Sequence, residues 1–122
     1  MDKNQNEVDK NQFSLNEEEK VELLKIARST ISEYLAKNTI PAINESSLPA
    51  NLLVHAGAFV TLKEEGQLRG CIGSFNPDQP LYKVVQSMAI ASSTEDYRFT
   101  PVKASEVPKL EIEISVLTPP LS

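Results

Sequence analysis

The sequence predicts an α+β fold in which an antiparallel-rich sheet, containing a β-hairpin, packs against two main helices. Two runs of alternating apolar residues lie on either side of a glycine within residues 57–75, a pattern that is typical of a hairpin. Two longer stretches repeat apolar residues at helical spacing, and a further alternating run lies at residues 110–117. Together these three observations define the predicted fold class.

The composition is that of a globular protein with a hydrophobic core. The chain has 122 residues, of which 40% are hydrophobic and 24% charged, and this length allows a single domain. A formal net charge of −5 argues against non-specific nucleic-acid binding, although a local basic cleft is still compatible with it. The sequence shows no membrane span and no signal sequence, and its one cysteine cannot form an internal disulfide. We therefore expect a cytoplasmic protein without a membrane partner.

Residues 1–12 are polar and contain the tetrapeptide DKNQ twice. This low-complexity composition predicts a disordered tail, with a short interaction tag as the alternative. We expect the folded domain to occupy residues 13–122.

The first predicted helix begins at Ser14. Ser14 and Glu17 have the spacing of a capping box, and further acids in the first turn suit the positive end of the helix dipole. The helix is expected to run to about Lys37, after which two prolines mark a loop and residues 51–55 form a brief helical turn. Its predicted apolar stripe consists of Val21, Leu24, Ala27, Ile31 and Leu35.

The hairpin at residues 57–75 is the stretch around which the chain is organised, and a glycine suits the positive φ of its turn. If the return strand alternates strictly, Leu68 and Ile72 face the core, whereas Arg69 and Cys71 share the opposite face. The guanidinium would then lie beside the only thiol of the chain. Glycines weaken a strand unless they allow a bulge or a close backbone approach. The return strand contains two of them, Gly70 and Gly73.

A second helix, with an apolar stripe from Leu81 to Ala91, is expected after a proline-rich turn that suits a helix start, and it is expected to fade across residues 92–94. The clearest strand of the sequence is Leu110–Leu117, in which apolar residues alternate with acidic ones. One face of this strand is expected to join the core. Whether one of its acids meets Arg69 depends on the order of the strands, which the sequence leaves open.

Three further residues are candidates for chemistry. Asp96 and Arg98 lie in the loop after the second helix, where they either bind a substrate carboxylate or phosphate or form an ion pair that fixes the loop. His55 is the only histidine; a general base needs a partner and a cleft, and His55 with Cys71 would give zinc only two ligands. We therefore treat His55 as incidental and predict no metal site and no cofactor.

Four segments of the sequence resemble one known family. They are GAFVTL at residues 57–62, LRGCIG at 68–73, DYRF at 96–99 and EIEISVLT at 111–118. In this combination and spacing the sequence resembles the AMMECR domain proteins, from about Ser14 to Pro119. The resemblance implies an intracellular protein with an α+β fold of two lobes, in which the LRGCIG strand lies next to a cleft.

The sequence departs from the pattern of that family in two ways. Tyr97 stands where a proline is common. Family members also continue well past the segment that ends at Thr118, so the resemblance implies that residues 13–122 form an AMMECR-like domain that is incomplete at its C-terminus. Without its later neighbours, the strand at residues 110–117 should expose an edge or an apolar patch.

The resemblance also implies partners and site residues. In many prokaryotes, family members are encoded beside, or fused to, a Memo-like protein and a radical SAM enzyme. This context suggests both as partners, and it suggests a role in nucleotide or RNA modification. Carried over by position, the functional candidates are Arg69, Gly70, Cys71, Gly73, Asp96 and Arg98.

Three functional hypotheses follow. In the first, the LRGCIG face and the DYRF loop bind a small anionic ligand or the Memo-like and radical SAM partner proteins. In the second, the chain is a cysteine-dependent enzyme: Cys71 is the nucleophile, Arg69 favours its thiolate, and Asp96 and Arg98 orient the substrate. In the third, the glycines and Cys71 serve tight packing alone, and the function lies in the part of the family pattern that follows Thr118.

Overall fold

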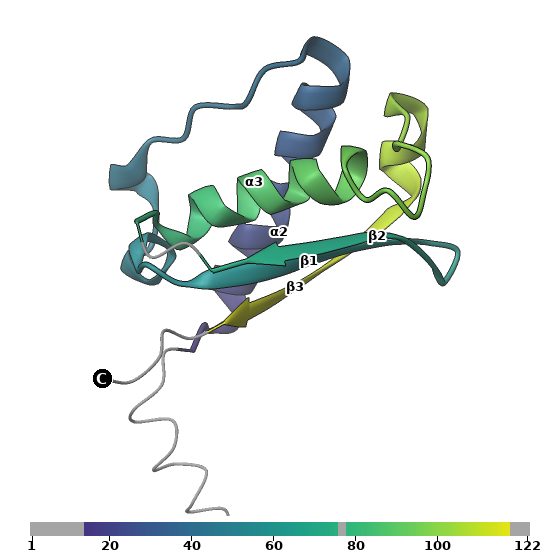
Figure 1. The fold of residues 1–122 in the computed structure, drawn as a ribbon. Helices are drawn as coiled ribbons and strands as arrows, with labels where there is room; N and C mark the ends of the chain where they lie inside the picture. Colours follow the sequence, from purple (N-terminus) through teal and green to yellow (C-terminus); the bar gives the residue numbers. More distant parts are fainter. Residues whose placement is uncertain (1–13, 76–77, 118–122) are drawn as a thin grey trace, which may run out of the picture.

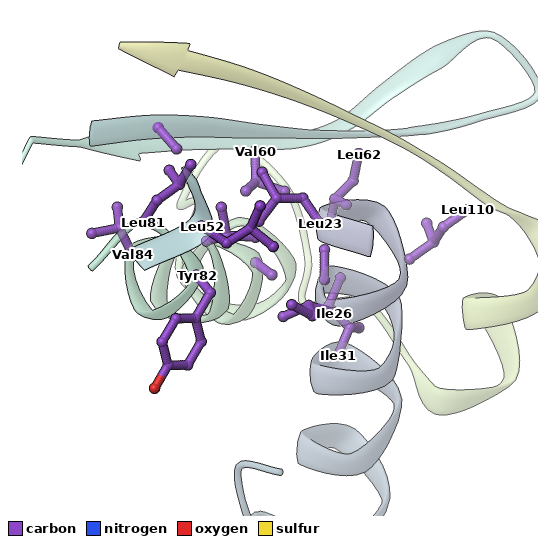
Figure 2. Packing of buried hydrophobic residues seen from close by; sticks show 14 of the residues in the cluster. Leu23, Ile26, Ile31, Leu52, Val60, Leu62, Leu81, Tyr82, Val84 and Leu110 are labelled. Atoms are coloured by element: carbon purple, nitrogen blue, oxygen red, sulfur yellow. The ribbon is translucent and has the colours of Figure 1, made fainter. Parts of the chain in front are cut away.

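The computed structural model describes residues 14–75 and 78–117. Its main elements are α2 (Glu17–Lys37), β1 (Gly57–Glu64), β2 (Gln67–Ser74), α3 (Leu81–Thr94) and β3 (Leu110–Leu117), with short 3-10 helices at Glu45–Ser47, Ala50–Leu53 and Ala104–Lys109. Both helices lie on one face of the sheet (Figures 1 and 2). The predicted α+β class is therefore confirmed. The tail predicted for residues 1–12, and part of the predicted proline-rich turn, lie outside the described residues.

The N-cap of helix α2 is Asn16, two residues after the predicted cap Ser14. The side-chain oxygen of Asn16 accepts a hydrogen bond from the N–H of Glu19 at 2.8 Å, and the carboxylate of Glu19 accepts one from the N–H of Asn16 at 2.9 Å. This is a capping box, and it replaces the predicted box of Ser14 and Glu17. The helix ends as predicted, and Asn38 follows it in the left-handed conformation, with φ of 61°.

The strands lie in the order β2-β1-β3, and both neighbouring pairs are antiparallel. β1 and β2 form the predicted hairpin. Its two-residue turn consists of Glu65 and Gly66, with φ of 54° and 81°, as favoured hairpin turns require. β1 is the central strand, and its helix-facing residues Ala58, Val60 and Leu62 are completely buried.

The pairing register of the hairpin shifts within β2. Leu62 pairs with Gly70, whereas the next residue of β1, Lys63, pairs with Leu68, so Arg69 is the extra residue of a β-bulge. The strict alternation predicted for β2 is therefore wrong at this point. Leu68, which alternation places in the core, is 39% exposed, and alternation no longer determines the direction of Arg69.

The core lies between the sheet and the two helices (Figure 2). Helix α3 packs on β1 and β2, whereas α2 packs on α3 and β3. The predicted stripe of α2 is correct for Ala27 and Ile31, which are completely buried, and wrong for Val21 and Leu24, which are 49% and 37% exposed. The stripe is rotated because Leu23, rather than its neighbour, faces the core.

Helix α3 extends to Thr94, the last of the residues across which it was expected to fade. The hydroxyl groups of Ser93 and Thr94 both donate to the C=O of Ile90, at 2.9 and 2.8 Å. Polar residues that signal the end of a helix in the sequence here bond back to the helix itself. The last strand, β3, has the predicted bounds.

Candidate functional site

The LRGCIG segment lies in β2, and its first glycine lies where α3 touches the sheet. A Cβ atom on Gly70 would lie 2.0 Å from the carbonyl oxygen of Ser92, which is far inside van der Waals contact. Because the obstacle is backbone, it cannot turn aside as a flexible side chain can. The prediction that a strand glycine allows a close backbone approach is therefore confirmed for Gly70.

The hydroxyl group of Ser92 takes part in the hydrogen bonding of the sheet. It accepts a hydrogen bond from the N–H of Ile72 at 3.0 Å and donates one to the C=O of Val60 at 2.7 Å. Val60 and Ile72 are partners in the β1–β2 register, so the hydroxyl bridges the two strands. Ser92 is only 2% exposed, so its hydroxyl makes these two bonds inside the core, where solvent would not replace it.

The DYRF loop binds the outer edge of β2 through Asp96. Oδ2 of Asp96 accepts a hydrogen bond from the N–H of Cys71 at 3.0 Å. Arg98 donates from Nε and Nη2 to the two carboxylate oxygens, at 2.9 and 2.7 Å, and its Nη2 lies 3.5 Å from the C=O of Cys71. The ion pair thus contacts both backbone groups of Cys71, as a neighbouring strand would. Of the two interpretations of Asp96 and Arg98, the structure contains the ion pair, and a ligand contact stays a prediction.

The electrostatics of this pair follow from its geometry. The Arg98 guanidinium, and then the N–H of Cys71, hold the pKa of the Asp96 carboxyl well below its ordinary value. The same carboxylate raises the pKa of Arg98. The Asp96 side chain is 5% exposed and that of Arg98 is 51% exposed. The guanidinium is therefore fixed on its inner side and open to solvent on the other.

Arg69 ties the bulge to the segment that precedes β3. Its Nε and Nη2 donate to the carboxylate of Glu106 at 3.2 and 3.0 Å, and its Nη1 donates to the C=O of Thr100 at 2.7 Å. The N–H of Lys103, and then Arg69, lower the pKa of Glu106. The acid that meets Arg69 is thus Glu106 rather than an acid of β3, which lies on the far side of β1. These bonds use the guanidinium within the fold, and none of them involves the thiol of Cys71.

The thiol of Cys71 is half-buried on the sheet face away from the helices. The hydroxyl of its cross-strand partner Thr61 lies 3.1 Å from Sγ, and either atom can be the donor. A threonine hydroxyl does not serve as a general base. His55 forms a bridge with Pro80 before β1 begins, at about 20 Å from Thr61 along an extended chain. Within the described residues, the contacts of the thiol thus include no base that would activate it.

The same face of the sheet exposes a large aromatic side chain. Phe59 is 42% exposed, and its ring covers Gly73, where a Cβ atom would come within 2.6 Å of three ring carbons. The second glycine of the segment is thus explained by the ring above it. Tyr97, which neighbours Arg98 in the loop, is 96% exposed. We call the surface formed by Phe59, Cys71, Gly73, Tyr97 and Arg98 the hairpin surface.

A groove of about 490 Å³ lies elsewhere, between α2 and β3. It contains none of the predicted site residues, so it is not the cleft that the resemblance implies beside the LRGCIG strand. The apolar side chains in its walls are Leu15, Leu23, Leu24, Ile112, Ile114 and Val116.

Two searches of the described residues gave negative results. No group of three or more histidine, cysteine, aspartate or glutamate side chains in residues 14–75 and 78–117 is arranged to hold a metal ion. In the same ranges, no helix combines the length and the apolar character that crossing a membrane requires.

Comparison with known proteins identifies the family. The sequence matches the AMMECR1 family model over residues 24–122. The chain belongs to the AMMECR1 family. A relative from Methanothermobacter thermautotrophicus is 43% identical over 98 residues, covering 80% of this chain and 50% of the relative. The relative PH0010 from Pyrococcus horikoshii is 41% identical over 105 residues, with coverage of 80% and 50%.

The fold of this AMMECR1-family chain is also found in a solved structure. The crystal structure of PH0010, described as an uncharacterized protein, matches with a TM-score of 0.80 and 38% identity, covering 87% of this chain and 54% of that one. The family resemblance drawn from the four segments is thus confirmed. The chain spans about half the length of the curated relatives that it matches.

Two residues of the site escape the sequence analysis of this AMMECR1-family chain. Ser92 belongs to no recognised motif, and its only signal is a small polar residue at the end of a helix that follows a glycine-rich strand. Glu106 lies in a segment that the sequence shows only as a connection. Both act through contacts with β2 across 20 and 37 residues of sequence, respectively.

Proposed function

We propose that this AMMECR1-family chain is a binding module that recognises a partner protein through the hairpin surface. One observation carries the proposal: Arg98, fixed by Asp96, lies at the C=O of Cys71 and 5.3 Å from the centre of the Phe99 ring, and the adjacent Tyr97 is 96% exposed. Arginine and aromatic residues are enriched where protein partners bind tightly. Their positions here cost little further ordering, because the ion pair already holds the guanidinium.

The hairpin surface favours a protein over a small anionic ligand. A small-molecule site usually encloses most of its ligand, whereas the side chain of Arg98 is 51% exposed and Tyr97 is 96% exposed. The charge of Arg98 is also offset by the Asp96 carboxylate at 2.7 Å, which weakens its attraction for a free anion. Its solvent side can still bond a carboxylate or a carbonyl of a partner protein. The Memo-like and radical SAM proteins that the resemblance associates with this family are the partners that we propose.

The alternative, a cysteine-dependent enzyme acting in nucleotide or RNA modification, has less support. It requires a base or a cationic group that activates the thiol. Arg69, which was assigned this role, bonds Glu106 and the C=O of Thr100. The side chain within hydrogen-bond distance of Sγ is Thr61, and the guanidinium of Arg98, which interacts electrostatically with the thiol, is already paired with Asp96.

The proposal is tested by measuring the affinity of the chain for each purified partner by isothermal titration calorimetry. Tyr97→Ala removes an exposed ring, so the free energy of unfolding should change by less than about 0.5 kcal/mol. The dissociation constant should nevertheless rise about tenfold or more if the ring lies in the interface. Ile40→Ala is the matched control, because Ile40 is also an exposed apolar residue, at 53%, but lies in the loop after α2.

Two results would overturn the proposal. One is that neither partner binds the wild-type chain. The other is that Tyr97→Ala and Phe59→Ala bind as tightly as Ile40→Ala does.

A further inference from the structure

The DYRF loop is held to β2 at its end as well as at its start. At the start, Asp96 accepts a hydrogen bond from the N–H of Cys71 at 3.0 Å. At the end, Nη1 of Arg69 donates to the C=O of Thr100 at 2.7 Å, and its Nη2 donates to the next C=O along the chain at 3.4 Å. The two anchors on β2 are two residues apart. Residues 97–99 lie between them, and they include the exposed tyrosine and the arginine of the hairpin surface.

The guanidinium of Arg69 is itself fixed in direction. Its Nε and Nη2 donate to the carboxylate of Glu106, which also accepts from the N–H of Lys103 at 2.7 Å. The side chain of Arg69 is 17% exposed and that of Glu106 is 22% exposed. The rigid fork of an arginine can bond a carboxylate and backbone carbonyls at the same time. The guanidinium is therefore engaged inside the fold.

The bonds on either side show what the loss of Arg69 would release. The N–H of Phe99 donates to the C=O of Asp96 at 3.0 Å and forms a tight turn. The N–H of Val102 donates to the C=O of Ser93 at 2.7 Å and closes the base of the loop. Without the fork of Arg69, the stretch between the turn and the base would lose its contact with β2. The loop would then move while the core beneath it stays folded.

We infer that Arg69 is a positioning residue for the hairpin surface. It fixes the end of the DYRF loop, so that Tyr97 and Arg98 keep the places from which they meet a partner protein. A protein whose binding conformation is populated for only part of the time binds more weakly by that fraction. Arg69 thus raises the affinity without touching the partner. This role rests on the proposed function, whereas the position of the loop can be measured without a partner.

Arg69→Lys provides the test, because it keeps a positive charge beside Glu106 but lacks the fork that reaches the carbonyls as well. Arg28→Lys is the matched control. Arg28 also donates to two backbone carbonyls, those of Val107 and Leu110, at 2.8 and 2.6 Å, and both lie outside the DYRF loop. Circular dichroism and thermal unfolding establish that each variant is folded at the temperature of the measurements.

Hydrogen exchange of the chain without a partner gives the first readout. Amides of the central strand β1 serve as the reference, because their exchange reports global unfolding. Relative to this reference, the amide of Phe99 should exchange about fivefold faster or more in Arg69→Lys, and at the wild-type rate in Arg28→Lys. A Phe99 amide with the same relative rate in both variants would overturn the inference.

The affinity for a partner, measured by isothermal titration calorimetry, gives the second readout. The dissociation constant should rise about fivefold or more in Arg69→Lys and less than about twofold in Arg28→Lys. When Tyr97 and Arg98 are both replaced by alanine, Arg69→Lys should have almost no further effect, because the residues through which it acts are gone.

Two results of the binding experiment would overturn the inference. One is a dissociation constant that Arg69→Lys leaves unchanged, as a role in stability alone would. The other is an equal effect of Arg69→Lys with and without the two alanine substitutions, since Arg69 would then contact the partner itself. If no partner binds the wild-type chain, the proposed function fails, and the exchange of the Phe99 amide decides alone whether Arg69 positions the loop.

Discussion

Replacing Ser92 with alanine tests whether its hydroxyl is part of the sheet. The substitution removes the group that accepts from the N–H of Ile72 and donates to the C=O of Val60, and Val60 is completely buried. A buried polar group left without a partner costs about 1–3 kcal/mol. Val60 and Ile72 are partners in the β1–β2 register and can still bond each other, so we expect a cost of about 2 kcal/mol, within the range for one such group. This is a large fraction of the stability of a small domain, which is about 5–15 kcal/mol.

Ser93→Ala is the matched control for this measurement. Ser93 is equally buried, at 2% exposed, but its hydroxyl donates to the C=O of Ile90 within the same helix. Its loss should cost about 1 kcal/mol or less, because no sheet group is left unpaired. Urea unfolding followed by circular dichroism gives both values, and the amide of Ile72 should exchange faster only in Ser92→Ala. Equal costs for the two variants would refute the role of the bridge.

Three further predictions follow from the site and the core. Gly70→Ala should destabilise the chain by about 3 kcal/mol or more, because the new Cβ meets a backbone carbonyl. Gly73→Ala should cost about 1 kcal/mol, because the half-exposed ring of Phe59 can move. Thermal unfolding compares the two variants, and equal losses of stability would contradict this reasoning. The lowered pKa of Glu106 means that its contribution to stability is complete above its ordinary pKa of 4.5 and is lost as the pH falls through the folded pKa. The difference in urea midpoint between wild type and Glu106→Gln should therefore shrink below about pH 4.5, and a difference that is independent of pH would argue against it. Burial, together with a hydrogen bond to a glutamate, raises the pKa of Tyr82 to about 12. An absorbance titration of the folded chain should therefore show a tyrosine ionisation step near that pH, and Tyr82→Phe should remove it. A wild-type titration without this step would be inconsistent with the packing of Tyr82.

An element of the fold could be predicted from the sequence where only one local pattern fits its residues. The alternation of β3 gave its bounds, and Gly66 placed the hairpin turn. The start of α2 was missed because Ser14 with Glu17 and Asn16 with Glu19 both have the spacing of a capping box. Only the packing of the chain decides between two such caps.

The site was predictable only as far as its residues are close in sequence or share a motif. The ion pair of Asp96 and Arg98 was one of two stated alternatives, because the residues are neighbours in one loop. The direction of Arg69 was not predictable, since one bulged residue reverses the alternation on which that prediction depends. Its partner Glu106 lies 37 residues away, and no periodicity of the sequence links the two.

The bridge made by Ser92 has a consequence for how the chain folds. The hairpin of β1 and β2 can form its turn locally, but its hydrogen bonding at Ile72 is completed by a side chain that comes 20 residues later, from α3. The hairpin is therefore expected to reach its native geometry only when the helix docks, and the two should appear in a single kinetic phase of refolding. Substitutions in the hairpin at Ile72 and in the helix at Ser92 would then slow folding to the same degree.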